Sequence, residues 1–223
     1  MARRRVALST RPTLIVLGGV NGAGKSSVIG RYLQTAYAID WFNPDSFARE
    51  LVAQGLEQGE ANGLAWKENV RRLGEALENG GDYAFETTLG GNSIPGLIHK
   101  ATNTHNVFLW YCGLDSPERH LTRVAARVAN GGHDIPEAKI RERYGRAPVN
   151  LINLMPQLAG LEVYDNSTGA DADGIIPDPI RILSIRENKI LYPDPRDLEA
   201  LVLTPDWARA IVEAALREQA KEG

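Results

Sequence analysis

The chain has 223 residues, of which 43% are hydrophobic and 24% are charged, and its formal net charge at pH 7 is −3. This length suits one α/β domain, and the slight acidic excess argues against a protein whose main partner is nucleic acid. The single cysteine, Cys112, excludes an intramolecular disulfide and a metal site made of several cysteines. No apolar run approaches the roughly 20 residues that cross a bilayer, so we expect no membrane partner. The lone cysteine favours a reducing, cytoplasmic location.

One domain is predicted over residues 13–223, behind a basic segment at 1–12 that we interpret as a flexible arm. Apolar runs of strand length alternate along it with segments of helical periodicity. The strands are predicted at residues 13–18, 37–42, 83–86, 107–113 and 161–165. The helices are predicted at 25–35, just after 43–45, at 58–79, at 116–129 and from 136 onward. This alternation favours an α/β fold of the P-loop kinase type, with a mainly parallel five-stranded sheet and helices on both faces.

Cap and breaker residues refine these helices. Ser116 and Pro117 are typical of a helix cap and a first helical residue. Pro148 and Pro156 are expected to break or bend the helix in which they lie. The helix at 58–79 is expected to bury one apolar face, formed by Leu64, Val70, Leu73 and Leu77.

A C-terminal extension, over about 179–223, follows the last predicted strand of the sheet. Residues 180–185 and 189–192 flank a three-residue turn and predict a β-hairpin. Thr204 and Pro205 then predict the start of a final helix that ends near residue 222.

Residues 19–26, Gly-Val-Asn-Gly-Ala-Gly-Lys-Ser, match the phosphate-binding pattern G-x-x-x-x-G-K-[ST] in full. The match lies between a buried strand and a helix, where backbone N–H groups and the helix N-terminus converge on phosphate oxygens. We expect Lys25 to reach the β- and γ-phosphates of ATP and the Ser26 hydroxyl to bind Mg²⁺. The residues expected to hold ATP in this loop are Gly19, Asn21, Gly22, Ala23, Gly24, Lys25, Ser26 and Ser27. The sequence contains neither an LSGGQ-like ABC signature nor an Asn-Lys-x-Asp guanine reader, which favours a small kinase.

Two carboxylates are candidates for the side of the site that receives the phosphoryl group. Asp45 follows the predicted strand at 37–42, and Glu86 ends the strand at 83–86. Ligands of parallel α/β sheets bind at the carboxyl ends of the strands, and a kinase needs a carboxylate that orients the acceptor hydroxyl and accepts its proton. The alternatives are that Asp45 only caps the following helix and that Glu86 is a surface residue.

Two helices between the fourth and fifth predicted strands carry basic stripes, which together predict a lid over about 116–147. The first stripe recurs every four residues and consists of Arg119, Arg123 and Arg127. The second lies on one face of the next helix and consists of Lys139, Arg143 and Arg146. Arg141 is turned by about 200° from Arg143, so both cannot reach one phosphate. Lid arginines stabilise the charge that develops in phosphoryl transfer, although such stripes are also typical of solvated faces. His133, between the helices, either orders the joint by hydrogen bonding or is an ordinary loop residue.

Several of these segments together resemble one family, the zeta-toxin-like P-loop kinases. The resemblance covers about residues 13–167 and is carried by residues 18–26, 43–45, 85–88, 123–136, 140–144 and 163–167. Residues 123–136, Arg-Val-Ala-Ala-Arg-Val-Ala-Asn-Gly-Gly-His-Asp-Ile-Pro, are more specific than the phosphate-binding loop. Within the family, the chain is more similar to a shorter branch described as predicted ATPases than to the large toxins.

The resemblance implies a P-loop kinase sheet and assigns roles to individual residues. The best-known members phosphorylate a hydroxyl of the amino sugar of UDP-N-acetylglucosamine and are restrained by a small antitoxin. By this resemblance, Asp45 is the catalytic base, and the acceptor site includes Glu86, Thr87 and Thr88. Arg127 and Arg143 correspond to lid arginines that act with Lys25 on the transferred phosphate, and Asn166 is expected near the adenine.

Three functions remain open from the sequence. The first is a kinase that uses ATP and Mg²⁺ to phosphorylate a sugar nucleotide. The second is a kinase of another acceptor, such as a nucleic-acid 5′ end or a small alcohol, although the acidic net charge makes nucleic acid the weaker choice. The third is a nucleotide-dependent binding module without catalysis.

Overall fold

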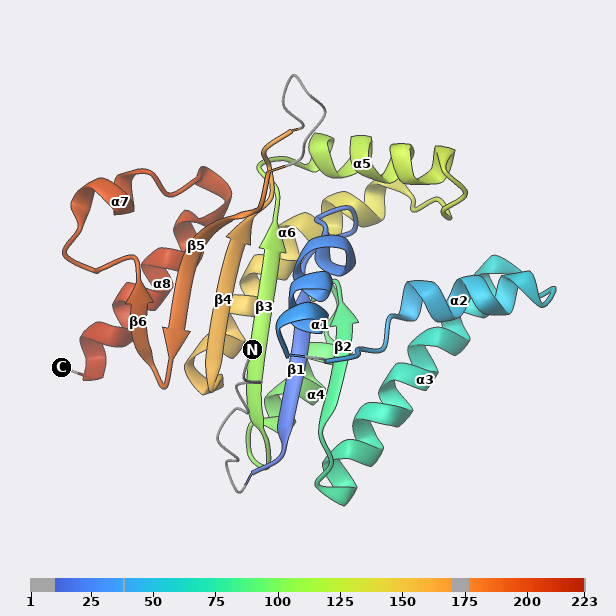
Figure 1. Cartoon of the computed structure of the whole chain (residues 1–223), viewed down its shortest axis with the longest axis horizontal. Coiled ribbons are helices and arrows are strands. Elements are labelled where there is room, and N and C mark those ends of the chain that lie inside the picture. Colours follow the sequence, from blue (N-terminus) through green and yellow to red (C-terminus); the bar gives the residue numbers. More distant parts are fainter. Residues whose placement is uncertain (1–10, 38, 170–176, 223) are drawn as a thin grey trace.

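The computed structural model describes residues 11–37, 39–169 and 177–222, and within these ranges the chain is an α/β fold on a six-stranded sheet with the order β2-β1-β3-β4-β5-β6 (Figure 1). The parallel strands are β1 (Thr13–Gly18), β2 (Tyr83–Thr87), β3 (Asn106–Gly113) and β4 (Gly160–Asp165). The antiparallel strands are β5 (Ile180–Arg186) and β6 (Lys189–Tyr192). The predicted α/β class is therefore confirmed. The predicted arm at 1–12 lies outside the described residues except for its last two positions.

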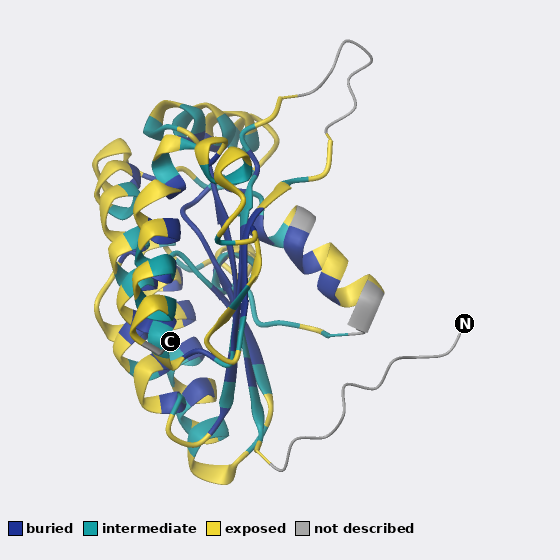
Figure 2. Ribbon diagram, turned by 90° about the vertical axis from the view of Figure 1, so that its left-hand side faces the viewer, coloured by how far each residue is buried: buried dark blue, intermediate teal, exposed yellow. Residues whose placement is uncertain are grey.

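Helices cover both faces of the sheet, but unequally (Figure 2). The helical elements are η1, a π-helical turn (Lys25–Gly30), α1 (Arg31–Tyr37), α2 (Pro44–Ala53), α3 (Gln58–Asn79), α4 (Ser93–Ala101), α5 (Pro117–Ala129), α6 (Glu137–Leu154), η2, a 3-10 turn (Met155–Gln157), α7 (Leu198–Val202) and α8 (Asp206–Glu222). The larger apolar core includes Ile98 of α4, Leu151 of α6 and Ile211 of α8. Ile29 and Leu33, from η1 and α1, pack on the opposite face. No helix among the described residues is long and apolar enough to cross a membrane.

The strand predicted at 37–42 is wrong, and so is the total of five strands. Helix α1 continues to Tyr37, α2 begins at Pro44, and the described residues between them, 39–43, form no strand. Within residues 39–43, Phe42 forms an isolated bridge with β2: its N–H donates to the carbonyl of Ala84 and its own carbonyl accepts the N–H of Glu86, both at 2.9 Å. This single bridge nevertheless anchors the start of α2 beside the end of β2.

The C-terminal hairpin is present and belongs to the main sheet, because β5 pairs with β4 along its length. Its turn contains two residues, not three, since β5 extends to Arg186. Glu187 and Asn188 have φ angles of 48° and 61°, the left-handed backbone that a tight two-residue hairpin turn requires.

Several helix predictions are confirmed and others need correction. Helix α3 has the predicted bounds, but Leu64 is 37% exposed, and the residues that α3 buries are Ala61, Ala65, Asn69 and Leu73. Ser116 caps α5 as predicted, with its Oγ accepting the N–H of Arg119. Helix α6 runs through Pro148 without a break, and Pro156 lies in the short turn η2 behind it. Helix α4 was not predicted. Pro95 lies in the first turn, where its missing N–H costs no hydrogen bond.

Candidate active site

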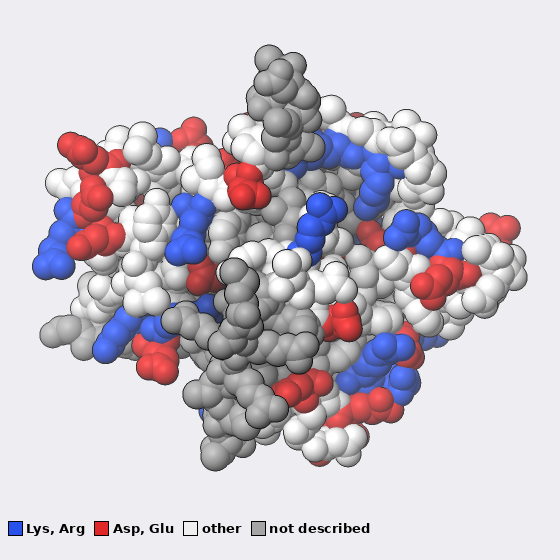
Figure 3. Space-filling model, viewed as in Figure 1, with Lys and Arg blue, Asp and Glu red and all other residues white. Residues whose placement is uncertain are grey.

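A cavity of about 540 Å³ opens at the carboxyl ends of β1 and β2, where the phosphate-binding loop meets the first turn of α2 and the helices α3, α4 and α6. Figure 3 shows basic side chains gathered under α5 and further ones over α2, with the surface hollowed between these helices. Asn21, Lys25, Asp45 and Glu86 line the cavity. The structure therefore brings the predicted phosphate-binding and acceptor-side residues to one place.

Glycines let the phosphate-binding loop turn tightly at the end of β1. Gly19, Gly22 and Gly24 have φ angles of 140°, 82° and 94°, which residues with a side chain rarely adopt. A Cβ atom on Gly19 would also overlap the carbonyl oxygen of Cys112. The loop leads directly into η1, so its backbone N–H groups lie at the start of a helix, which favours anions.

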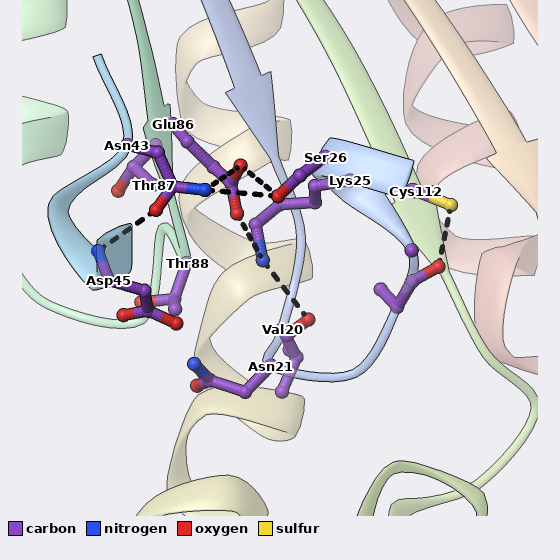
Figure 4. Close-up of polar contacts among 12 residues, drawn as sticks. Val20, Asn21, Lys25, Ser26, Asn43, Asp45, Glu86, Thr87, Thr88 and Cys112 are labelled. Atoms are coloured by element: carbon purple, nitrogen blue, oxygen red, sulfur yellow. Dashed lines mark hydrogen bonds and ion pairs between the residues drawn. The ribbon is translucent and has the colours of Figure 1, made fainter. Parts of the chain in front are cut away.

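Glu86 lies at the centre of a polar cluster with Lys25, Ser26 and Asn43 (Figure 4). The Nζ of Lys25 is 3.4 Å from Glu86 Oε1, and the Ser26 hydroxyl donates to Glu86 Oε2 at 2.6 Å. The amide nitrogen of Asn43 lies 3.1 Å from both Ser26 Oγ and Glu86 Oε2. Glu86 is only 8% exposed, which rules out the reading as a surface residue. It contacts the phosphate-binding loop directly, in addition to lining the cavity.

The donor chemistry of this cluster suits Mg²⁺. A serine hydroxyl and a carboxylate oxygen are the hard oxygen ligands that Mg²⁺ prefers, and Ser26 and Glu86 present them side by side. Among the described residues, no group of three or more His, Cys, Asp or Glu side chains could hold a metal by itself. Mg²⁺ in kinases keeps several waters and substrate phosphates as ligands, so few protein ligands are needed.

Asp45 faces the cavity as the second residue of α2. The cap of this helix is Asn43, so the reading of Asp45 as a simple cap is wrong. Its Oδ2 lies 3.4 Å from Nη1 of Arg127, which reaches across from α5. Arg127 also donates to the backbone carbonyl of His133 at 3.4 Å, while its buried Nε has no hydrogen-bond partner in the part of the chain that the structure describes. The ring of His133 is half-buried at the cavity wall, and this burial lowers its pKa.

Arg143 of α6 reaches the phosphate-binding loop from the opposite side. Its Nη1 donates to Oδ1 of Asn21 at 2.6 Å, and burial lowers the pKa of its guanidinium. The close approach of α6 depends on Gly90, because a Cβ there would overlap the Cγ of Arg143. Arg141 points away and pairs with Glu118 and Glu137, as its position on the helix predicts.

The remaining arginines of the first stripe contact different groups. Arg119 forms an ion pair with Asp115 at 2.7 Å. Arg123 donates to the carbonyl oxygens of Asn166 at 2.7 Å and Thr168 at 3.3 Å. The buried amide of Asn166 in turn donates to the carbonyl of Ala23 at 2.9 Å. Asn166, expected near the adenine, thus lies against the back of the phosphate-binding loop.

The other predicted site residues are less involved. Thr87 and Thr88 line the cavity, and their hydroxyls accept the N–H groups of Leu89 and Gly90. Ser27 is exposed and its hydroxyl faces the carbonyl of Gly24 at 3.5 Å, outside the cavity lining.

Sequence reasoning missed Asn43 and His120 as parts of the site. An asparagine before proline at a helix start was a signal for the capping role of Asn43. His120 had no such signal. It is 1% exposed, and its Nδ1 donates to the carbonyl of Asn21 at 2.8 Å. Burial lowers its pKa to about 4, so the ring is neutral at pH 7.

The chain is similar to one known protein in sequence and to several solved structures in fold. No family model matches it. An uncharacterized protein of Haemophilus influenzae is 32% identical over 127 residues, which cover 56% of this chain and 88% of that protein. The crystal structure of AvrRxo1-ORF1:-ORF2 with ATP superposes with a TM-score of 0.60 at 15% identity, over 95% of this chain and 76% of that one.

A second solved structure is the PezAT chromosomal toxin–antitoxin system of Streptococcus pneumoniae. It superposes with a TM-score of 0.51 at 18% identity, over 77% of this chain and 72% of that one. At 15% and 18% identity, the two structural matches show that these proteins share the fold of this chain.

Proposed function

Because the chain belongs to the same family as the Haemophilus influenzae protein and has the fold of the zeta-toxin-like P-loop kinases, we propose that it is an ATP- and Mg²⁺-dependent kinase of a small-molecule hydroxyl. The observation that carries the proposal is that Asp45 and Lys25 line the same cavity while Arg127 pairs with Asp45 from α5. A cavity lined by a carboxylate and a P-loop lysine, with a lid arginine paired to that carboxylate, brings together the groups that phosphoryl transfer needs.

In this proposal Asp45 orients the acceptor hydroxyl and accepts its proton as the bond to phosphorus forms. Lys25, Arg127 and Arg143 stabilise the negative charge on the transferred group. Ser26 and Glu86 would hold Mg²⁺, which supplies charge neutralisation on the phosphates when it is bound. The lid comprises residues 116–147, and the extension at 179–223 completes the same domain.

For the acceptor, we propose a sugar nucleotide such as UDP-N-acetylglucosamine. A cavity of about 540 Å³ has the size of a nucleotide-binding site. One wall presents the ring of Trp66 between the amides of Asn62 and Asn69, and the other presents Lys139 and Arg146. An aromatic ring, amides and cations suit a ligand with a flat base, hydroxyl groups and phosphates.

The likeness to the PezAT toxin–antitoxin system also supports a small protein partner for this chain. We include such an antitoxin, and a cytoplasmic location, in the proposal. Co-purification of the chain with the product of a neighbouring small gene is the direct test.

The function is tested by incubating the protein with γ-labelled ATP and a cytosolic metabolite extract, followed by identification of labelled products by mass. We expect one labelled metabolite with the wild type and none with Asp45→Ala, which should still bind ATP. Asp206→Ala is the matched control, since this carboxylate is exposed on α8 and pairs only locally with Arg209. Release of labelled phosphate alone would contradict the kinase, and label on a polynucleotide would replace the proposed acceptor.

A further inference from the structure

Asn43 lies where β2, the phosphate-binding loop and α2 meet (Figure 4). The residue before it, Phe42, is held to β2 by two backbone hydrogen bonds of 2.9 Å, one of them with the N–H of Glu86. Asn43 is therefore fixed at the end of β2 with an extended backbone, at φ −110° and ψ 108°. From this position its side chain extends in two directions.

The side-chain oxygen of Asn43 caps α2. Its Oδ1 accepts the N–H of Asp45 at 2.9 Å and the N–H of Ser46 at 3.2 Å. These two donors have no partner within the helix, so the cap fixes the backbone of its first turn. The backbone that carries Asp45 is thus held by Asn43.

The side-chain nitrogen of Asn43 contacts the phosphate-binding side of the site. Its Nδ2 donates toward Ser26 Oγ and Glu86 Oε2, each at 3.1 Å. The orientation of the amide follows from its surroundings, because a flipped amide would turn its N–H₂ group against two backbone N–H donors. One side chain therefore joins the Ser26–Glu86 pair to the first turn of α2.

Other good capping residues cannot make both connections. Serine and threonine cap helices as well as asparagine does, but they have no second polar arm. Aspartate has one, yet its second oxygen would lie about where Nδ2 is, next to the carboxylate of Glu86, and would repel it. Asparagine combines a capping acceptor with a donor for two oxygens.

We propose that Asn43 is a positioning residue that couples the occupation of the Ser26–Glu86 position by Mg²⁺-bound nucleotide to the placement of Asp45 against the acceptor. The effect of this coupling on catalysis rests on the proposed kinase function. The coupling itself requires the protein and Mg²⁺-bound nucleotide alone, without an acceptor. Asn43 acts through Ser26 and Glu86 on one side and through the backbone N–H groups of Asp45 and Ser46 on the other.

The test uses the full chain with Asn43→Ser, Asn43→Asp and Asn43→Ala, and with Asp197→Ala as the matched control. Asp197 caps α7, away from the cavity, so its loss removes a helix cap without touching the site. For each protein we would measure thermal stability, Mg²⁺–ATP affinity, kcat and KM with the acceptor, and amide hydrogen exchange at Asp45 and Ser46 with and without Mg²⁺–ATP.

In the wild type, nucleotide binding should slow exchange at Asp45 and Ser46. Asn43→Ser keeps the helix cap, so it should melt at a higher temperature than Asn43→Ala and bind nucleotide within about threefold of the wild type. It should nevertheless lose the nucleotide-induced protection and lower kcat by roughly tenfold or more with little change in KM. Asn43→Asp should likewise lose the nucleotide-induced protection and lower kcat. Asn43→Ala should lose stability as well, and Asp197→Ala should lose only stability.

Wild-type kcat and wild-type protection in Asn43→Ser would overturn the coupling while leaving the kinase intact. Unchanged exchange at Asp45 and Ser46 when nucleotide binds the wild type would overturn it too. Absence of phosphoryl transfer by the wild type to any acceptor would instead refute the proposed function, and the exchange data would still decide the coupling.

Discussion

At the scale of single residues, the buried ion pair between Lys25 and Glu86 matters most for the charge balance of the candidate site. Both side chains are less than a tenth exposed, and a buried charge is costly unless it is paired and hydrogen-bonded. Glu86 meets this need with Lys25, Ser26 and Asn43 together. The carboxylate thus stabilises the free site and stands next to the hydroxyl that we propose for Mg²⁺.

Replacing Glu86 by glutamine should therefore change the response to Mg²⁺. We expect kcat/KM to fall by roughly 10²-fold or more and the Mg²⁺ concentration at half-maximal activity to rise, because a negative ligand is lost. A Mg²⁺ titration of phosphoryl transfer measures both. Glu162→Gln is the matched control, since Glu162 is a buried carboxylate on β4 that pairs with Arg186, outside the cavity. An unchanged Mg²⁺ dependence in Glu86→Gln would remove Glu86 from the metal position.

His120 should make the free energy of unfolding depend on pH. Its pKa of about 4 in the folded protein lies below the ordinary value of 6.5 because burial disfavours the charged ring. Between these values the unfolded chain binds the proton and the folded chain does not. The contribution of the neutral His120 ring to the free energy of unfolding is thus complete above about pH 6.5 and is lost as the pH falls toward 4. At pH 5 the loss should be about 2 kcal/mol in the free energy of unfolding.

Urea unfolding at pH 7.5 and pH 5.0 checks this expectation. His120→Asn keeps a donor for the carbonyl of Asn21 and removes the titrating ring. Its free energy of unfolding should fall by about 2 kcal/mol less than that of the wild type between the two pH values. Equal losses in both proteins would show that other groups carry the pH dependence.

At the scale of elements, α5 and α6 are held to the site by close backbone approach as well as by arginines. Helix α6 comes near the loop between β2 and α4 at Gly90, and Tyr144 donates from α6 to the carbonyl of Asp115, just before α5. The ring of His120 packs edge-on against Tyr144, which connects α5 to α6. Arg127 and Arg143 are therefore carried by two helices that contact each other.

Gly90→Ala should displace α6 and with it Arg143. The added methyl group would overlap the Cγ of Arg143, so we expect kcat to fall by roughly tenfold or more while the protein stays folded. Steady-state kinetics and circular dichroism measure the two effects. Gly96→Ala is the control, because a Cβ on this residue of α4 meets nothing within 4 Å. Full activity of Gly90→Ala would show that the position of α6 does not matter.

Periodicity, cap residues and breakers predicted most of the helices and strands. These local signals failed where contacts between distant parts of the chain decided the structure. The bounds of α3 followed from periodicity, and the start of α5 followed from Ser116 and Pro117. The apolar residues at 37–42 suggested a strand, but α1 includes Tyr37, and among the described residues of this segment Phe42 alone forms a bridge, with β2. Leu64 looked like a core residue, yet α3 turns small residues such as Ala61 and Ala65 inward, where α2 lies close.

At the scale of the whole molecule, the C-terminal extension is part of the core. Strand β5 pairs with β4, and α8 contributes Ala208, Ile211, Val212 and Ala215 to the same apolar cluster as the parallel strands. The ring of Trp207 packs against Tyr111 of β3, and its indole N–H donates to Asp165 at 3.1 Å. The extension therefore completes the fold beside the phosphate-binding site.

Ile211→Ala should accordingly destabilise the entire protein by about 2–5 kcal/mol, since it removes a fully buried side chain and leaves a cavity. Leu203→Ala, which truncates a side chain that is 82% exposed, should change stability by about 0.5 kcal/mol or less. Chemical denaturation followed by circular dichroism compares the two. Little effect of Ile211→Ala would mean that α8 is a detachable appendage.

The sequence by itself determined the features that depend on neighbouring residues. The loop at 19–26, the start of α5 and the alternation of strands and helices follow from local backbone preferences and from motifs whose members lie next to each other in the chain. Only the tertiary structure decided which side chains meet. Glu86 turned from an acceptor-side candidate into a partner of Lys25 and Ser26, and Asn43 became the link to Asp45. Such contacts depend on strand order and helix placement, which local sequence does not encode.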